Sequence, residues 1–214
     1  MQKYISEFIG TFILLVSIVG SGIAGQQYTN DQMVILVSHA VVIGLTLIFI
    51  IGIFANFSGA HFNPIVSILF FLQKELSIKD LCLFISIQIT AAILGTIFAN
   101  YIFGLSIVEI SSNIRSGTNI YISEIFASFG LLMVILLSKV GGKNIVAFNV
   151  GIYITAAIIF TSSASFANPA VSIARIFTES FAGINPSTVI FFIGSQVIGM
   201  FGAYFLYNRL FKTK

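Results

Sequence analysis

Two related copies of one short stretch place the strongest constraint on how this chain can fold. The first runs from Ser58 to Ile68 and the second from Ser163 to Ile173, and both contain Asn-Pro followed by an apolar run. Asn is a favoured helix N-cap, and Pro is favoured at the first helical position. Each copy is therefore predicted to be a small-residue loop that starts a short helix, near 63–73 and near 168–179.

The rest of the chain is too apolar for a soluble domain. Of its 214 residues, 57% are hydrophobic and 8% are charged, whereas about a quarter are charged in a typical soluble domain. Six stretches can cross a hydrocarbon core of about 30 Å, whereas the two Asn-Pro segments are too short. The six fall near 5–24, 33–55, 80–103, 121–139, 145–162 and 187–208. The predicted fold class is an all-α membrane protein with six transmembrane helices and two re-entrant half-helices.

The chain is an internal duplication within a single domain that covers residues 1–214. Residues 5–15 match residues 122–132, and repeat 1 covers about 1–104 whereas repeat 2 covers about 118–214. Each repeat has three spans, an odd number, so the second repeat must be inverted relative to the first. Inverted-topology repeats are typical of membrane transport proteins.

The basic residues predict the orientation. With a cytoplasmic N-terminus, the outer connectors carry only Arg115, and eight Lys and Arg residues lie on the inner side, which is a strong positive-inside bias. These eight are Lys3, Lys74, Lys79, Lys139, Lys143, Arg209, Lys212 and Lys214. We therefore expect a multi-pass protein of the cell (inner) membrane with both termini in the cytoplasm. The net charge of +3 is too small and too scattered for nucleic-acid binding.

Inversion makes the first Asn-Pro stretch enter the membrane from the cytoplasm and the second from outside. Non-helical backbone is tolerated at membrane depth only where protein buries it or a water-filled cavity solvates it. The loops before Asn63 and Asn168 therefore predict an aqueous path, with the two half-helices meeting tip to tip near the midplane.

Paired Asn-Pro-Ala-type motifs in a six-span inverted repeat resemble the aquaporin, or major intrinsic protein, family along the whole chain. The motif residues are Asn63, Pro64, Ile65, Asn168, Pro169 and Ala170. The first and fourth helices also carry the similar residues Glu7 and Glu124. The resemblance implies a homotetramer in the lipid bilayer with one pore per subunit, and passive flow of water or small neutral solutes.

Pore chemistry follows from the two half-helix ends. Asn63 and Asn168 are expected to cap these ends through their side-chain oxygens, which leaves each amide NH2 to donate into the pore. The positive helix ends repel cations, and a water that accepts from both amides is a poor link for proton transfer. Backbone carbonyls of both loops would supply acceptors: Gly59, Ala60, His61, Ala164, Ser165 and Phe166.

Glu7 and Glu124 are charges inside spanning helices, where they are costly and usually functional or paired. They are either proton carriers of a coupled secondary transporter or acceptors that hold the loops before Asn63 and Asn168. Their symmetric placement, one per loop, favours the second interpretation. A coupled transporter of a small solute remains the alternative function.

The selectivity filter departs from the family pattern. Most members carry Arg three residues after the second Asn, where this chain has Val171. Counting from the two Asn residues predicts a filter of Ile43, Ala156, Ser165 and Val171, with Thr155 and Ala157 as alternatives in the fifth span. This filter lacks a fixed cation and predicts passage of glycerol, urea or undissociated arsenous acid. The segment from Ser165 to Ile184 is similar to bacterial members associated with arsenic resistance.

Several further residues have two interpretations. Arg175, one turn beyond Val171, either places a positive charge at the outer mouth or is a surface residue that pairs with Glu179, and we favour the surface role. His39 either faces the outer vestibule or is a satisfied structural residue, and the structural role is again favoured. Ile65 is expected to add bulk beside the midplane.

No enzyme is expected, because the sequence shows no nucleophile–base pair, metal cluster or phosphate loop. Cys82 stands alone, and two His residues without nearby carboxylates or Cys do not make a metal site. No metal and no cofactor is predicted.

Overall fold

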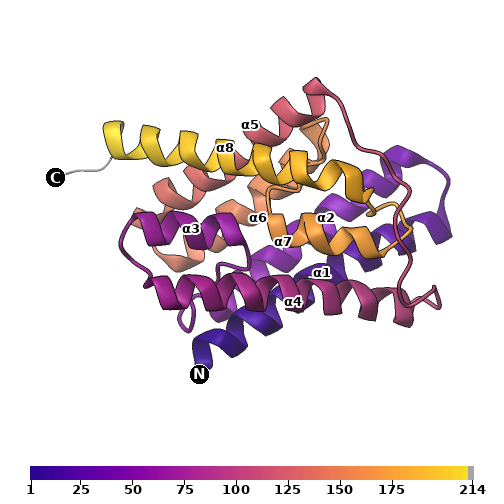
Figure 1. Cartoon of the computed structure of the whole chain (residues 1–214), viewed down its shortest axis with the longest axis horizontal. Coiled ribbons are helices and arrows are strands. Elements are labelled where there is room, and N and C mark those ends of the chain that lie inside the picture. Colours follow the sequence, from indigo (N-terminus) through magenta and orange to yellow (C-terminus); the bar gives the residue numbers. More distant parts are fainter. Residues whose placement is uncertain (212–214) are drawn as a thin grey trace.

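The computed structural model describes residues 1–211 and is helical throughout that range apart from connecting loops (Figure 1). Lys212 and Lys214, two of the residues used to predict orientation, lie outside it. Six helices are long and apolar enough to cross a membrane. They are α1 (Gln2–Tyr28), α2 (Gln32–Phe54), α4 (Ile78–Ile102), α5 (Thr118–Ser138), α6 (Lys143–Phe160) and α8 (Pro186–Leu210). The predicted six-span, all-α fold class is confirmed.

Two short helices, α3 (Pro64–Leu72) and α7 (Pro169–Ala174), begin at the two Asn-Pro pairs. In Figure 1 they lie end to end between α4 and α8, and both contact these long helices. The predicted segment 168–179 is too long, because α7 ends at Ala174 and only one 3₁₀ turn, η2 (Arg175–Phe177), follows. The Ile176 carbonyl accepts from the Ser111 N–H of the α4–α5 connector at 2.9 Å, so the chain leaves the helix there.

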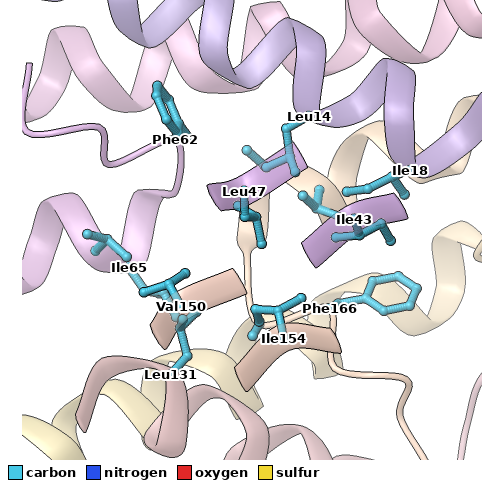
Figure 2. Packing of buried hydrophobic residues seen from close by; sticks show 14 of the residues in the cluster. Leu14, Ile18, Ile43, Leu47, Phe62, Ile65, Leu131, Val150, Ile154 and Phe166 are labelled. Carbon is cyan, nitrogen blue, oxygen red and sulfur yellow. The ribbon is translucent and has the colours of Figure 1, made fainter. Parts of the chain in front are cut away.

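The two repeats are joined along α2 and α6. Within the repeats α1 packs along α4 and α5 along α8, whereas α2 and α6 meet each other across the repeats. Gly44 and Gly151 make this crossing close, since a Cβ added at Gly44 would lie 2.7 Å from the Gly151 carbonyl oxygen. The close crossing brings one face of each helix to the same central space. Figure 2 shows Ile43 and Leu47 of α2 facing Val150 and Ile154 of α6 across it.

Candidate pore

A cavity of about 480 Å³ runs along the centre of the helix bundle. Helices α2 and α6 line it with residues spaced four apart, which therefore share one helical face. These residues are His39, Ile43, Leu47 and Ile51 of α2 with its C-cap Ala55, and Val146, Val150, Ile154 and Ile158 of α6. At 1.5 Å per residue, the stripe from His39 to Ala55 extends about 24 Å, which is most of the hydrocarbon thickness.

Helices α1 and α5 complete the walls with Leu14, Ile18, Leu131 and Ile135. Sequence analysis missed these four residues. A signal was present, because Leu14 and Leu131 each lie seven residues after the matching Glu of their repeat and so share its helical face. The walls are therefore aliphatic in both repeats, and the polar groups of the path come from the two loops and the cavity ends.

The two Asn residues tie the half-helices to each other. Asn63 Oδ1 accepts from Ile65 N at 3.1 Å, and Asn63 Nδ2 donates to the Ala167 carbonyl at 2.8 Å. Asn168 Oδ1 accepts from Ala170 N at 3.0 Å, and Asn168 Nδ2 donates to the Phe62 carbonyl at 2.8 Å. Each amide therefore uses one N–H on the opposite loop, and both Asn residues also line the cavity. From the sequence we expect both N–H groups of each amide to donate into the pore, and these bonds between the loops are not predicted.

The loops before the half-helices contain non-glycine residues in a backbone conformation that such residues rarely adopt. Positive φ angles occur at Ala60 (53°) and Phe62 (49°) in the first loop, and at Ala164 (56°), Ser165 (43°) and Ala167 (45°) in the second. Each such residue costs of the order of 1–3 kcal/mol unless the surroundings hold it. The two loops share this unusual backbone, and their N–H groups at His61, Phe62, Phe166 and Ala167 donate to buried carboxylates.

Glu7 holds the first loop from behind. Glu7 Oε1 accepts from His61 N at 2.9 Å and from the Ser58 hydroxyl at 2.7 Å, while Glu7 Oε2 accepts from Phe62 N at 2.7 Å. Gln88 Nε2 also donates to Glu7 Oε2, at 2.8 Å. The carboxylate is fully buried and does not line the cavity.

Glu124 repeats this arrangement in the second half. Glu124 Oε1 accepts from Ala167 N at 2.6 Å, and Oε2 accepts from Phe166 N at 3.2 Å. Gln196 Nε2 donates to Glu124 Oε1 at 2.8 Å and to the Ser172 hydroxyl at 2.9 Å. Glu124 is also fully buried away from the cavity, so both carboxylates face loop backbone.

The structure places three of the four predicted filter residues on the cavity wall and excludes the fourth. Ile43, Ser165 and Val171 line the cavity, whereas Ala156 lies on the exposed outer face of α6. Ile154 and Ile158 line the cavity instead. Each is two residues from Ala156, which is roughly half a turn of the α6 helix. Counting back from Asn168 fails because the intervening loop is not helical and does not preserve the phase of α6. The alternatives fail as well, since Thr155 packs against Gly44 and Ala157 does not line the cavity.

Comparison with known proteins identifies the family. Residues 1–162 match the family described as Major intrinsic protein. The aquaglyceroporin AqpS of Rhizobium meliloti (strain 1021) is 38% identical over 198 residues, which cover 92% of this chain and 85% of that protein. The chain belongs to the major intrinsic protein family.

Other members of the major intrinsic protein family are more distant. Aquaporin NIP1-1 of Arabidopsis thaliana is 29% identical over 144 residues, covering 63% of this chain and 48% of that protein. The solved structure of the aquaglyceroporin from Plasmodium falciparum superposes with a TM-score of 0.76 at 21% identity, covering 98% of this chain and 96% of that chain. This last likeness shows a shared fold. As a family member, the chain is a multi-pass membrane protein and not an enzyme.

Not every motif residue of this family member faces the cavity. Pro64, Ile65, Pro169 and Ala170 are buried and do not line it. Ile65 packs in the hydrophobic cluster, as Figure 2 shows, so its extra bulk relative to Ala is accommodated by the core and does not narrow the path.

The expected surface role of Arg175 is wrong. Its side chain is only 4% exposed and lines the cavity. Glu179, the predicted partner, instead accepts from the Ser112 hydroxyl at 2.6 Å and from Ser112 N at 2.5 Å. The bond from the Ser112 side chain is the main cause that lowers the pKa of Glu179 below its ordinary value. Arg175 is thus free of Glu179.

The two His residues lie at different depths of the cavity. His39 Nδ1 lies 2.8 Å from the Ser21 hydroxyl, so this buried ring has a partner and also lines the cavity. His61 Nδ1 lies 3.1 Å from the Ser67 hydroxyl, and its ring packs against Phe70. Both interpretations of His39 therefore hold at once: it is structurally satisfied and faces the path.

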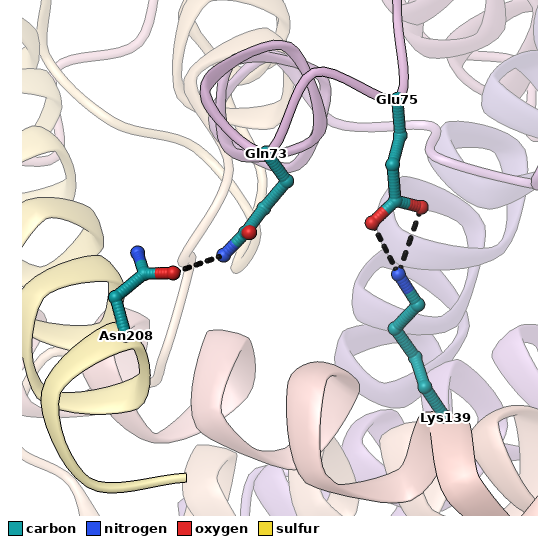
Figure 3. Close-up of polar contacts among 4 residues, drawn as sticks. All are labelled: Gln73, Glu75, Lys139 and Asn208. Carbon is teal, nitrogen blue, oxygen red and sulfur yellow. Dashed lines mark hydrogen bonds and ion pairs between the residues drawn. The ribbon is translucent and has the colours of Figure 1, made fainter. Parts of the chain in front are cut away.

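Two polar contacts join the repeats near one end of the cavity (Figure 3). Lys139 Nζ lies 2.6 Å and 2.8 Å from the two carboxylate oxygens of Glu75, and both residues line the cavity. Gln73 Nε2, at the end of α3, lies 3.4 Å from Asn208 Oδ1 of α8. The Glu75–Lys139 pair is half-exposed, so it contributes only about 0–1 kcal/mol to stability.

Proposed function

We propose that this protein is a passive channel for water and small neutral solutes, with glycerol, urea and undissociated arsenous acid as candidates. One observation carries the proposal: the cavity along the bundle is lined by the aliphatic residues Ile43 and Ile158, and by Val171 at the position where most family members carry Arg. Such walls offer room and few fixed partners to a compact neutral solute. The name of the similar R. meliloti protein, an aquaglyceroporin, supports the same solute class.

Charge exclusion is proposed to arise at the midplane. The N-termini of α3 and α7 both point at the cavity, and each carries roughly half a positive charge. Asn63 and Asn168 hold these ends together and each keep one N–H for a passing molecule. A cation meets two positive helix ends there, whereas a neutral hydroxyl or water accepts hydrogen bonds from both amides.

Domain organisation, oligomeric state and membrane orientation are proposed together. We propose one domain, a homotetramer, and a place in the cell (inner) membrane with both termini in the cytoplasm. The inner-side lysines Lys139 and Lys143 gather at the cavity end beside Glu75, which supports this orientation. Unpartnered apolar side chains on the outward faces, such as Leu45 and Phe49 of α2, suit lipid or neighbouring subunits.

A passive channel is distinguished from a coupled transporter by its indifference to ion gradients. Purified protein in liposomes is expected to pass glycerol only downhill, at a rate unchanged by imposed proton or sodium gradients. The structure favours this outcome because Glu7 and Glu124 are both occupied by loop N–H groups. Glycerol accumulation against its own gradient, driven by either ion, would establish the coupled transporter instead.

A further inference from the structure

The outer part of the cavity holds a buried cation without a carboxylate partner. The ion pairs among residues 1–211 are Lys3–Asp80 and Lys139–Glu75, so no carboxylate in the described chain is in direct contact with Arg175, and Glu124 attracts it only through space. Arginine stays protonated in proteins, and burying an isolated charge is costly. A guanidinium that is kept at 4% exposure on a largely aliphatic wall needs an explanation.

Two contacts fix the position of Arg175. Its Nε donates to the carbonyl of Ala182 in the loop that follows η2. Its guanidinium carbon lies 3.5 Å from the centre of the Phe166 ring, within cation–π distance. Phe166 is itself anchored, because its N–H donates to Glu124. The second-repeat loop thus provides an aromatic platform on which the cation rests.

These two contacts leave the Nη groups of Arg175 available to donate hydrogen bonds into the cavity. None of the hydrogen bonds in the described chain uses the Nη atoms of Arg175, which lines the cavity together with Val171. Arg175 is four residues after Val171, and helical side chains lean toward the N-terminus, which here is the pore side of α7. The guanidinium therefore faces the path one turn outward of the position that lacks the family's usual Arg.

We propose that Arg175, held on Phe166, is a specificity-determining residue that supplies the cation missing at Val171. Because it sits one turn outward, it repels cations at the outer mouth and donates hydrogen bonds to solute oxygens, while the aliphatic filter at Val171 stays wide. This inference rests on the proposed channel function, and it explains how a filter without Arg still selects against charge.

Arg115 provides a matched control. Its guanidinium carbon lies 5.5 Å from the same Phe166 ring, and it donates to the carbonyls of Phe181 and Gly183. It does not line the cavity. Replacing Arg115 removes the same charge from the same neighbourhood without removing a group from the path.

The test measures sodium leak and glycerol permeability of proteoliposomes side by side. Arg175→Met is expected to raise the sodium leak about tenfold, the factor that corresponds to 1.4 kcal/mol of lost repulsion. Arg175→Lys, which keeps the charge, and Arg115→Met are expected to stay within about twofold of wild type. The double variant V171R/R175M, with a cation returned to the path, is expected to restore sodium exclusion. Arg175→Gln also removes the charge, is expected to leak as Arg175→Met does, and keeps the assay informative if R175M folds poorly.

An unchanged sodium leak in folded R175M or R175Q, or an equal rise in R115M, would overturn the proposal. A leak in the double variant as large as that of R175M would do the same, because a cation on the path would then not restore sodium exclusion. Failure of the proposed function is visible separately. Wild-type vesicles that pass no glycerol contradict the solute channel, whereas the sodium leak still reports on Arg175.

Discussion

Replacing Val171 by arginine is expected to lower glycerol permeability about tenfold or more and to leave water permeability within about twofold, since each 1.4 kcal/mol added to a barrier is tenfold in rate. Val171 is 3% exposed and lines the same cavity as Ile43 and Ile158. A guanidinium at this position adds bulk and a second cation one turn from Arg175. Stopped-flow light scattering of proteoliposomes measures both permeabilities in the same preparation.

A size-matched variant separates bulk from charge. Val171→Met has similar reach without the cation, and we expect an intermediate loss of glycerol flow. Glycerol permeability equal to wild type in Val171→Arg would show that Val171 is not at the narrow part of the path, and the wide-filter account would fail.

Replacing Glu124 by leucine is expected to prevent formation of a stable channel. The variant leaves the N–H groups of Phe166 and Ala167 without their acceptor, and Gln196 loses a partner as well. Each buried orphan donor costs about 1–3 kcal/mol, while folded proteins have only about 5–15 kcal/mol of stability in total. The second loop also loses the bonds that maintain its positive φ angles. The thermal midpoint Tm in detergent should fall sharply, and glycerol flow should vanish.

Glu109→Leu is the matched control for this prediction. Glu109 is exposed in the α4–α5 connector, and surface substitutions of this kind usually change stability by less than about 0.5 kcal/mol. A Glu124→Leu protein with the Tm and glycerol flow of Glu109→Leu would contradict the structural role of the carboxylate.

The sequence predicts the fold well wherever local chemistry and repetition act together. Asn63 and Asn168 are the N-caps that their residue types favour, and Pro follows each of them at the first helical position. The odd number of spans in each repeat requires the inversion that lets α3 and α7 meet. These features follow from hydrophobic length, capping and duplication, so they can be predicted without tertiary contacts.

The sequence predicts the filter poorly because that site depends on loop geometry. Ile43 lines the cavity, but Ala156 faces outward, since helical phase cannot be counted through the irregular loop before Asn168. Arg175 looked like a surface residue because its neighbours Ala182 and Phe166 come from loops whose paths are set by tertiary contacts. The carbonyl on the opposite loop that accepts from each Asn amide could not be predicted, for the same reason.

The central claim, a passive path for small neutral solutes, is tested most directly by glycerol flow into proteoliposomes of purified wild-type protein. After a hyperosmotic glycerol shock, these vesicles should re-swell about tenfold faster than protein-free vesicles. This factor corresponds to a barrier to glycerol that the protein lowers by about 1.4 kcal/mol. The initial rate should rise in proportion to the glycerol gradient. Re-swelling no faster than that of protein-free vesicles, with folded protein present, would contradict the account.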